Sequence, residues 1–305
     1  MSQSLLRLGT RNSALAMWQA KKVQSLLAEK GQEVELVPMK SEGDIELEKP
    51  LYELGITGIF TKSLDLALIQ NKIDFAVHSL KDVPTALAHG LKMWAVLERA
   101  DHRDVLIHKG ADFLEDEDRP ATIATGSLRR QAQWLHQFPQ HQVTNLRGNV
   151  QTRLQKLQDE DWQGAIFALA GLERMELVPE KTEFLDWMIP APAQGAIAVV
   201  GRESDTATEA LLSQINHQDT RICVEAERRL LRELEGGCTA PIGAYASLQG
   251  EEMTLKAGLF SLDGQEAITA EDKVSKEQGQ DLAIQLAKEI KAHGGDAILE
   301  ALRNG

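Results

Sequence analysis

The stretch Thr122-Ile-Ala-Thr-Gly-Ser-Leu-Arg-Arg-Gln-Ala-Gln-Trp-Leu135 contains the unit from which most of this chain is built. Its first four residues predict a short strand, and a helix is expected to follow from about Ser127 through Leu135. A strand that leads at once into a helix is the repeating unit of α/β proteins. Two arginines, Arg129 and Arg130, stand at the junction.

The same alternation fills the first two thirds of the sequence. The first series predicts strands at Leu5–Gly9, Val34–Pro38, Phe75–His78 and Leu91–Leu97, and helices from Ser13 and over Phe60–Gln70. Two charged segments, Glu98–Arg103 and the acidic loop Glu115–Pro120, then interrupt the pattern. A second series predicts strands at Thr122–Thr125, Val143–Leu146, Ala165–Leu169 and Ala196–Val200, and helices from Ser127 and over Asn149–Leu157 and Ala170–Leu177.

The pattern changes from about Thr220 onward. A helix is expected at Ile222–Leu234, and three strand-like segments and a last helix follow, at Gly243–Leu248, Met253–Phe260, Glu266–Val274 and Asp281–Ala292. The pair Asp263-Gly264 is a hairpin signal between the last two strands. We therefore expect a small α+β domain after two α/β domains.

Composition excludes several classes of protein. The 305 residues suit two or three domains, and 46 acidic against 33 basic residues give a formal charge of −13, which argues against a nucleic-acid partner. No apolar run approaches the roughly 18–20 residues of a membrane span, and Met1–Thr10 lacks the features of a signal peptide, so a cytoplasmic location is expected. We find no P-loop, no G-x-G-x-x-G pattern and no metal-ligand spacing.

Cations are placed systematically despite the acidic total. They fall just after a predicted strand, at or near the start of the next helix, at Arg11, Lys81, Arg129, Arg130, Arg147, Arg153 and Arg174. Ligands of α/β sheets bind beyond the carboxyl ends of the strands, where helix N-termini favour anions. A single arginine of this kind is commonly a surface salt bridge, but the repetition favours a cationic cleft between domains that binds an organic polyanion.

Three other side chains are candidates for chemistry. Asp82, beside Lys81, could stabilise a cation or hydrogen-bond a ligand N–H, although it could also be a turn cap before Pro84. Cys238 follows two glycines and could be a nucleophile or an attachment point, whereas Cys223 fits a helix core. His78 could be an acid–base group or a buried strand-end histidine.

Together these segments resemble the porphobilinogen deaminase family, also called hydroxymethylbilane synthases. The resemblance covers nearly the whole chain, and seven segments occur in family order. They are Thr10-Arg-Asn-Ser13 with Leu15-Ala16 and Trp18-Gln-Ala20, Ala76-Val-His-Ser-Leu-Lys-Asp-Val-Pro84, Gly126-Ser-Leu-Arg-Arg130, Leu146-Arg-Gly-Asn-Val150 with Thr152-Arg-Leu154, Ala170-Gly-Leu-Glu-Arg174, Pro192-Ala-Gln-Gly-Ala196, and Leu234-Glu-Gly-Gly-Cys238 with Pro241-Ile-Gly243.

The resemblance implies a three-domain fold. Two α/β domains of periplasmic-binding-protein type would comprise residues 1–97 with 196–215 and residues 98–195, because the chain crosses back into the first domain near Ala196. A small α+β domain, residues 216–305, would carry a dipyrromethane cofactor through a thioether to Cys238. The resemblance also implies a monomer.

The implied activity is a transferase reaction in tetrapyrrole and haem biosynthesis. Four porphobilinogen molecules are condensed on the dipyrromethane, each with loss of ammonia through an electrophilic azafulvene, and hydrolysis releases hydroxymethylbilane. By the same resemblance Asp82 is the catalytic residue, and Arg147 could also assist proton transfer. The residues implied to bind cofactor and substrate are Arg11, Ser13, Lys81, Thr125, Ser127, Arg129, Arg130, Arg147, Gly148, Asn149, Arg153, Arg174 and Gln194.

Three positions depart from the family pattern. Thr57 stands where a loop lysine is common, Glu42 replaces a usual Lys or Arg, and Gly126 replaces a common serine. Because position 57 carries no cation, we expect loop closure and substrate affinity to differ from the family pattern. It leaves the chemistry intact, because Asp82 and Cys238 are present.

Two other functions fit part of the sequence. A two-domain binding module with a cationic cleft would hold a carboxylate ligand and catalyse nothing, but it predicts an export signal and gives Cys238 no task. A different transferase could use Cys238 as a transient nucleophile.

Overall fold

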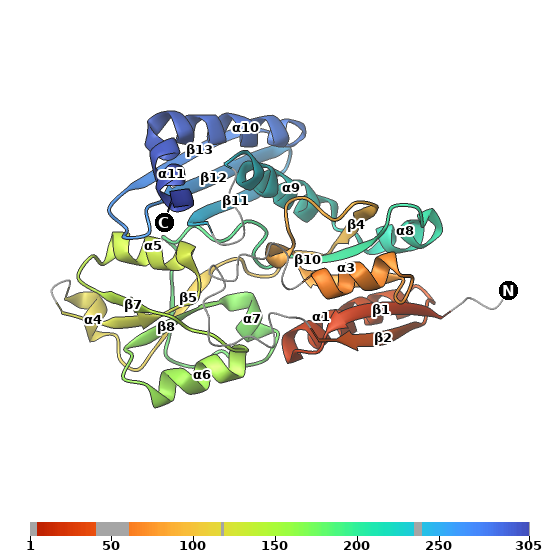
Figure 1. Ribbon diagram of the computed structural model, residues 1–305, viewed down its shortest axis with the longest axis horizontal. Helices are drawn as coiled ribbons and strands as arrows, with labels where there is room; N and C mark the ends of the chain where they lie inside the picture. The colour runs from red at the N-terminus through yellow and green to blue at the C-terminus, as the bar shows by residue number, and fades with distance from the viewer. Residues whose placement is uncertain (1–4, 41–60, 117–118, 235–239, 305) are drawn as a thin grey trace. The chain divides into compact units, whose positions relative to one another are not determined.

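The computed structural model describes residues 5–40, 61–116, 119–234 and 240–304 (Figure 1). These residues fall into two compact units. Unit 1 holds the described residues of Met1–Leu47, Ile56–Ala100 and Gly195–Arg221, and unit 2 holds those of Asp101–Gln194 and Ile222–Gly305. The chain therefore leaves unit 1 after Ala100 and returns to it at Gly195.

Unit 1 is an α/β domain around one five-stranded sheet of order β2-β1-β3-β10-β4. Strands β1, β2 and β3 are parallel, and β10 lies antiparallel between β3 and β4. Its elements are β1 (Leu6–Arg11), α1 (Ala14–Ala28), β2 (Val34–Met39), α3 (Lys62–Ile69), β3 (Phe75–Ser79), η2 (Leu80–Asp82), β4 (Leu91–Val96), β10 (Ile197–Arg202), α8 (Thr206–Leu212) and η3 (Ser213–Ile215).

Unit 2 contains a second five-stranded sheet with the same plan, in the order β7-β6-β8-β5-β9. Strands β6, β7 and β8 are parallel, and β5 lies antiparallel between β8 and β9. Its elements are β5 (Asp104–His108), α4 (Asp112–Glu115), β6 (Thr122–Ala124), α5 (Leu128–Gln137), β7 (Gln142–Thr144), α6 (Val150–Asp159), β8 (Gly164–Ala168), α7 (Leu169–Glu173) and β9 (Thr182–Phe184).

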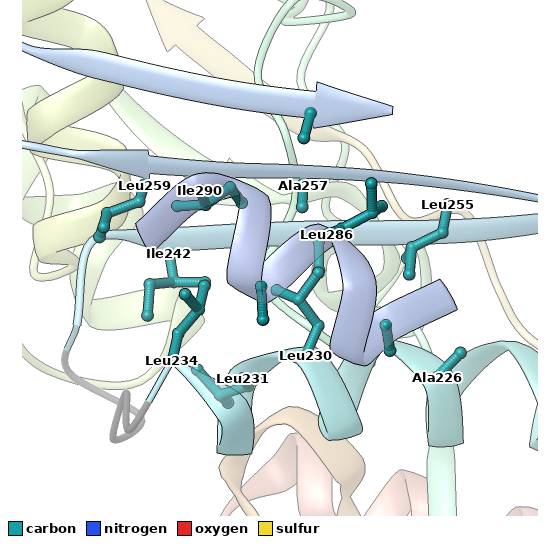
Figure 2. Close-up of a cluster of buried hydrophobic side chains, with 14 of the residues drawn as sticks. Ala226, Leu230, Leu231, Leu234, Ile242, Leu255, Ala257, Leu259, Leu286 and Ile290 are labelled. Carbon is teal, nitrogen blue, oxygen red and sulfur yellow. The ribbon is translucent and has the colours of Figure 1, made fainter. Parts of the chain in front are cut away.

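The last part of unit 2 is a three-stranded antiparallel sheet covered by helices. Figure 2 shows Leu230 of α9 and Leu234, the residue after that helix, in one buried apolar cluster. The same cluster contains Leu286 and Ile290 of α10 and Leu255 of the sheet. The elements are α9 (Gln218–Glu233), β11 (Ile242–Gln249), β12 (Glu252–Phe260), β13 (Ala267–Ser275), η4 (Lys276–Gln278), α10 (Gly279–Ile290), η5 (Lys291–Gly295) and α11 (Asp296–Asn304).

The structure confirms the predicted fold class, two α/β domains and a small α+β domain. Ser13 caps α1 as expected, since its side chain accepts a hydrogen bond from the Ala16 N–H. Helix α7 was predicted to reach Leu177 but ends at Glu173, and the chain turns at Glu176 with a φ of 56°. The precise domain boundaries, at residues 97/98, 195/196 and 215/216, stay a prediction.

Strand β5 was missed by the sequence reasoning. It follows directly after the charged segment Glu98–Arg103, where the pattern indicates only a break, yet its sequence Asp-Val-Leu-Ile-His is apolar at the centre. It is the strand on which Asp104 lies, so the omission also hid a buried carboxylate. Elements α4, β9, α8 and α11 were likewise not expected.

Gly201 of β10 offers a test of how tightly unit 1 is packed. A Cβ atom at Gly201 would lie 2.1 Å from Cη2 of Trp94, a fully buried ring. We expect Gly201→Ala to lower the free energy of unfolding by about 1–3 kcal/mol through overpacking. Gly110→Ala is the matched control, because no atom lies within 4 Å of its Cβ position. Thermal and urea denaturation measure both, and equal stabilities would contradict this account of the core.

Candidate active site

In unit 1, two neighbouring parallel strands bring the predicted cations and Asp82 to one edge. Arg11 is the last residue of β1, and β3 runs directly into the short helix η2, which contains Lys81 and Asp82. Because the carboxyl ends of parallel neighbours lie at the same sheet edge, the three charged side chains share that edge. All three are half-buried rather than enclosed, so an incoming ligand can reach them.

The turn that carries Asp82 is held from both sides. The Leu80 N–H donates to the Ala196 carbonyl at 3.0 Å, and the Val83 N–H donates to the Leu80 carbonyl at 3.1 Å. Before the turn, the Ser79 hydroxyl accepts a 2.8 Å hydrogen bond from the amide of Gln19, a buried residue of α1. The backbone around Asp82 is thus fixed by β10 and α1, which suits a residue that must present a carboxylate in one place.

His78 lies on β3, close to the carboxyl end of that strand, and is neutral. Burial, helped by the positive charge of Arg11, lowers the pKa of His78 to about 4. The side chain is buried on β3 opposite Ala198 of β10. The structure therefore favours the buried strand-end interpretation of His78 over an acid–base role near neutral pH.

In unit 2, two adjacent loops at the carboxyl ends of β6 and β7 carry most of the other predicted residues. The strands are parallel neighbours, and the Thr125 N–H extends the ladder by donating to the Thr144 carbonyl at 2.9 Å. The loops touch after that point, because a Cβ atom at Gly126 would lie 2.6 Å from the Leu146 carbonyl oxygen. This close approach leaves no room for a Cβ atom at position 126 in this chain.

Each loop leads into a capped helix. Ser127 caps α5 by accepting from the Arg130 N–H, and its own N–H donates to the Thr125 hydroxyl at 3.2 Å. Asn149 caps α6 by accepting from the Thr152 N–H at 2.9 Å. Two helix N-termini that start from neighbouring strands place their positive dipole ends at one sheet edge, an arrangement that favours anions.

The second loop depends on Gly148. Its φ is +116°, which side chains rarely adopt, and a Cβ atom there would lie 2.8 Å from Cγ2 of Thr152. The Gly148 carbonyl accepts a 2.7 Å hydrogen bond from Nε of Arg153, so this arginine shapes the loop as well as carrying charge. Arg147, the residue before Gly148, is buried.

Arg174 lies at the same end of the third parallel strand. It is the C-cap residue of α7, the short helix that follows β8, and β8 pairs with β6. Burial lowers its pKa to about 10, so the guanidinium is positively charged at neutral pH.

Arg129 and Arg130 occupy a different environment from the other cations. Both are buried in the first turn of α5, and both pair with Asp104, which is completely buried. Gln194 is also completely buried and donates to the same carboxylate at 2.9 Å. The structure therefore brings three of the predicted binding residues together around a carboxylate that the sequence reasoning missed; the apolar run of β5 was the available signal.

Three residues that the sequence singled out are not among the described residues. Cys238, Thr57 and Glu42 lie outside the described residues, whereas Cys223 is buried in the helical core of unit 2. Among the residues that the structure describes, no group of three or more His, Cys, Asp or Glu side chains could hold a metal ion. Within the same ranges, no helix has the length and apolarity needed to cross a membrane.

Comparison with known proteins decides which family has this arrangement. Two family models match, "Porphobilinogen deaminase, dipyromethane cofactor binding domain" over residues 6–210 and "Porphobilinogen deaminase, C-terminal domain" over residues 221–292. The chain belongs to the porphobilinogen deaminase family. Family membership also decides between an enzyme and a binding module, in favour of the enzyme.

Relatives within the porphobilinogen deaminase family match along the full length. The porphobilinogen deaminase of Chlorobium phaeobacteroides is 41% identical over 306 residues, covering 98% of each chain. That of Desulforamulus reducens is 42% identical over 304 residues, again covering 98% of each chain.

Among solved structures, the neighbours are more distant. The periplasmic VFT2 domain of Bordetella pertussis BvgS has a TM-score of 0.42 at 12% identity, covering 69% of this chain and 86% of that one. An ancestral cationic amino acid solute binding protein has a TM-score of 0.42 at 13% identity, covering 71% and 90%.

The neutral state of His78 predicts a pH dependence. Its pKa is about 4 in the folded chain against 6.5 ordinarily, so the unfolded chain binds this proton first as the pH falls. The stabilisation is complete above pH 6.5 and is lost progressively toward pH 4, amounting to roughly 2–3 kcal/mol between pH 7 and 4.5. Urea denaturation at both pH values should show a smaller loss for His78→Gln than for the unaltered chain.

The exposed His89 of unit 1 provides the control for that measurement. His89→Gln should keep the pH dependence of the unaltered chain. If His78→Gln and the unaltered chain lose the same free energy between the two pH values, His78 is not the buried neutral group described here.

Proposed function

We propose that this chain is a hydroxymethylbilane synthase that condenses four porphobilinogen molecules, each with loss of ammonia, on a covalently bound dipyrromethane and then releases hydroxymethylbilane. The observation that carries the proposal is the family match over nearly the whole chain, which includes both the sheet edge with Asp82 and the segment with Cys238. The monomer that the resemblance implies and the cytoplasmic location expected from the sequence both stay predictions.

The charges at the two sheet edges support this substrate. Each porphobilinogen unit carries an acetate and a propionate, so the product gains two negative charges per addition. Guanidinium groups bind carboxylates through paired hydrogen bonds and stay charged. Helix N-termini add N–H donors without a counter-charge. An acidic protein can therefore hold a polyanion when its cations are concentrated where the strands end.

The residues present fit the cofactor. Dipyrromethane has carboxylates and pyrrole N–H groups, and unit 2 offers matching donors at two capped helix N-termini. In addition, Nε of the buried Arg129 has no hydrogen-bond partner among the described residues, which leaves a donor for an acidic group. We propose Ser127, Arg147, Asn149, Arg153 and Arg174 as contacts for the carboxylates. Arg129 and Arg130 are proposed to supply positive charge to the same carboxylates, and Thr125, Gly148 and Gln194 to shape the site.

In unit 1, the proposed carboxylate contacts are Arg11, Ser13 and Lys81. Asp82 has the complementary charge: its carboxylate would accept hydrogen bonds from pyrrole N–H groups and stabilise the positive charge that develops as ammonia leaves the substrate. When bound, the dipyrromethane supplies the nucleophilic pyrrole carbon for the first addition. Cys238 is proposed to hold it through a thioether, which fixes the growing chain during successive additions.

Replacement of Asp82 tests the catalytic assignment. Asp82→Ala should keep the fold, because the side chain is half-buried, and should reduce tetrapyrrole release by about a thousandfold or more, since a preorganised charge at the reacting centre is lost. Porphobilinogen consumption and melting temperature are measured together. Asp219→Ala, at an exposed position in the first turn of α9, should release tetrapyrrole at the rate of the unaltered chain. Near-normal rates for Asp82→Ala would remove Asp82 from this role.

The attachment residue is tested by intact mass. The purified chain should carry a stable excess equal to one dipyrromethane, and Cys238→Ser should lose it. Cys223→Ser is the matched control and should keep the excess, because Cys223 is buried. An unmodified mass combined with normal turnover of porphobilinogen would refute the covalent cofactor.

A further inference from the structure

The carboxylate of Asp104 is the centre of a buried cluster in unit 2. Oδ1 accepts from Nε of Arg130 at 2.9 Å and from the amide of Gln194 at 2.9 Å. Oδ2 accepts from Nη2 of Arg129 at 2.7 Å. Asp104 and Gln194 are completely buried, and the two arginines are 4% and 6% exposed. The carboxylate thus bonds two consecutive side chains of the first helical turn of α5.

The far ends of the two guanidinium groups are also anchored. Nη1 of Arg129 donates to the Ile189 carbonyl at 2.7 Å, and Nη1 of Arg130 donates to the Ile166 carbonyl at 2.9 Å. Gln133, one turn further along α5, both donates to and accepts from the Ile189 backbone. Each guanidinium is therefore held between a carboxylate and a carbonyl, and its orientation is set by the fold rather than by solvent.

The hydrogen bonds described above do not use every N–H group of the Arg129 guanidinium. A guanidinium has five N–H groups, and the bonds above use two of Arg129 and a part of those of Arg130. Nε of Arg129 is buried with no hydrogen-bond partner among the described residues. The cluster is therefore ordered but not saturated.

The cluster has an excess positive charge. Over the described ranges, Asp104 is the one carboxylate that pairs with Arg129 or Arg130, so two guanidinium charges face one negative charge. Burial, together with repulsion from Arg130, outweighs the attraction of Asp104 and lowers the pKa of Arg129. A buried excess charge is costly unless an ion neutralises it, and the N-terminus of α5 adds a positive dipole end at the same place.

We infer that Asp104 is a positioning residue for cofactor capture, which holds Arg129 and Arg130 under the N-terminus of α5 so that their excess charge is directed at the carboxylates of the dipyrromethane. The inference rests on the proposed function. Without Asp104 the two adjacent cations repel each other and lose their common anchor, so the donor geometry at the start of α5 is lost even where the helix remains folded.

Uptake of cofactor by the cofactor-free chain tests this role. Chains are prepared free of dipyrromethane, incubated with porphobilinogen, and followed by intact mass at a temperature well below each melting point. Asp104→Asn should raise the porphobilinogen concentration for half-maximal uptake by about tenfold or more, because losing one partner of a buried charge pair is severe. A merely structural defect would lower the amount of folded chain without changing that concentration.

Glu227→Gln is the matched control. Glu227 is also completely buried in unit 2, and its carboxylate accepts from the Ala193 and Ala246 N–H groups at 2.6 and 2.8 Å. Both variants should lower the melting temperature, but Glu227→Gln should keep the half-maximal concentration of the unaltered chain. Equal values for Asp104→Asn and Glu227→Gln would overturn the inference.

A second variant covers the case in which Asp104→Asn does not fold. Gln194→Leu removes the neutral amide contact to Asp104 and leaves both ion pairs, so we expect a smaller rise, about threefold, since one hydrogen bond to a charged group is lost. No rise in that variant would also overturn the inference. Failure of the proposed function is distinguishable, because the unaltered chain itself would then take up no dipyrromethane.

Discussion

The ion cluster at Asp104 is the interaction on which the second α/β domain depends. A completely buried carboxylate is tolerated only when charged or polar donors surround it, and here the donors come from α5 and from Gln194 at the end of the chain's passage through unit 2. The same two guanidinium groups reach the carbonyls of Ile166 and Ile189. The carboxylate of Asp104 therefore links the inner strand β5, helix α5 and the segment that leads back to unit 1.

Both α/β domains bring their functional groups together in the same way, at the carboxyl ends of parallel strands. Each five-stranded sheet has four strands that run in one direction and one antiparallel strand, which takes the same place in the spatial order. In each sheet the antiparallel strand follows directly after a crossing of the chain between units, β5 after Ala100 and β10 after Gln194. Parallel strands align their carboxyl ends, so loops that are distant in sequence meet at one edge. The chemistry differs between the two edges: Asp82 belongs to the first, whereas capped helix N-termini and arginines dominate the second.

The net charge of the chain and the local charge at the strand ends have opposite signs. The chain as a whole has a formal charge of −13, which would repel a polyanionic product. Arginines and helix N-termini at the strand ends reverse the sign locally, and because several of them are partly or fully buried, their charges are screened less by salt than surface charges are. His78 stays neutral beside Arg11 for the same physical reason, since burial makes a second positive charge there expensive.

The sequence by itself determined most of the strand and helix pattern, the cap Ser13, and the position of the cations after strands, because these follow from local periodicity and hydrogen bonding. Its family motifs supplied the activity. Tertiary structure alone decided that Arg129 and Arg130 share a buried carboxylate, because that pairing joins residues 25 and 26 positions apart, and that Gln194 joins them from 90 positions away. Burial and long-range pairing have no local periodicity, so the partner of a charge is visible only once the chain has folded.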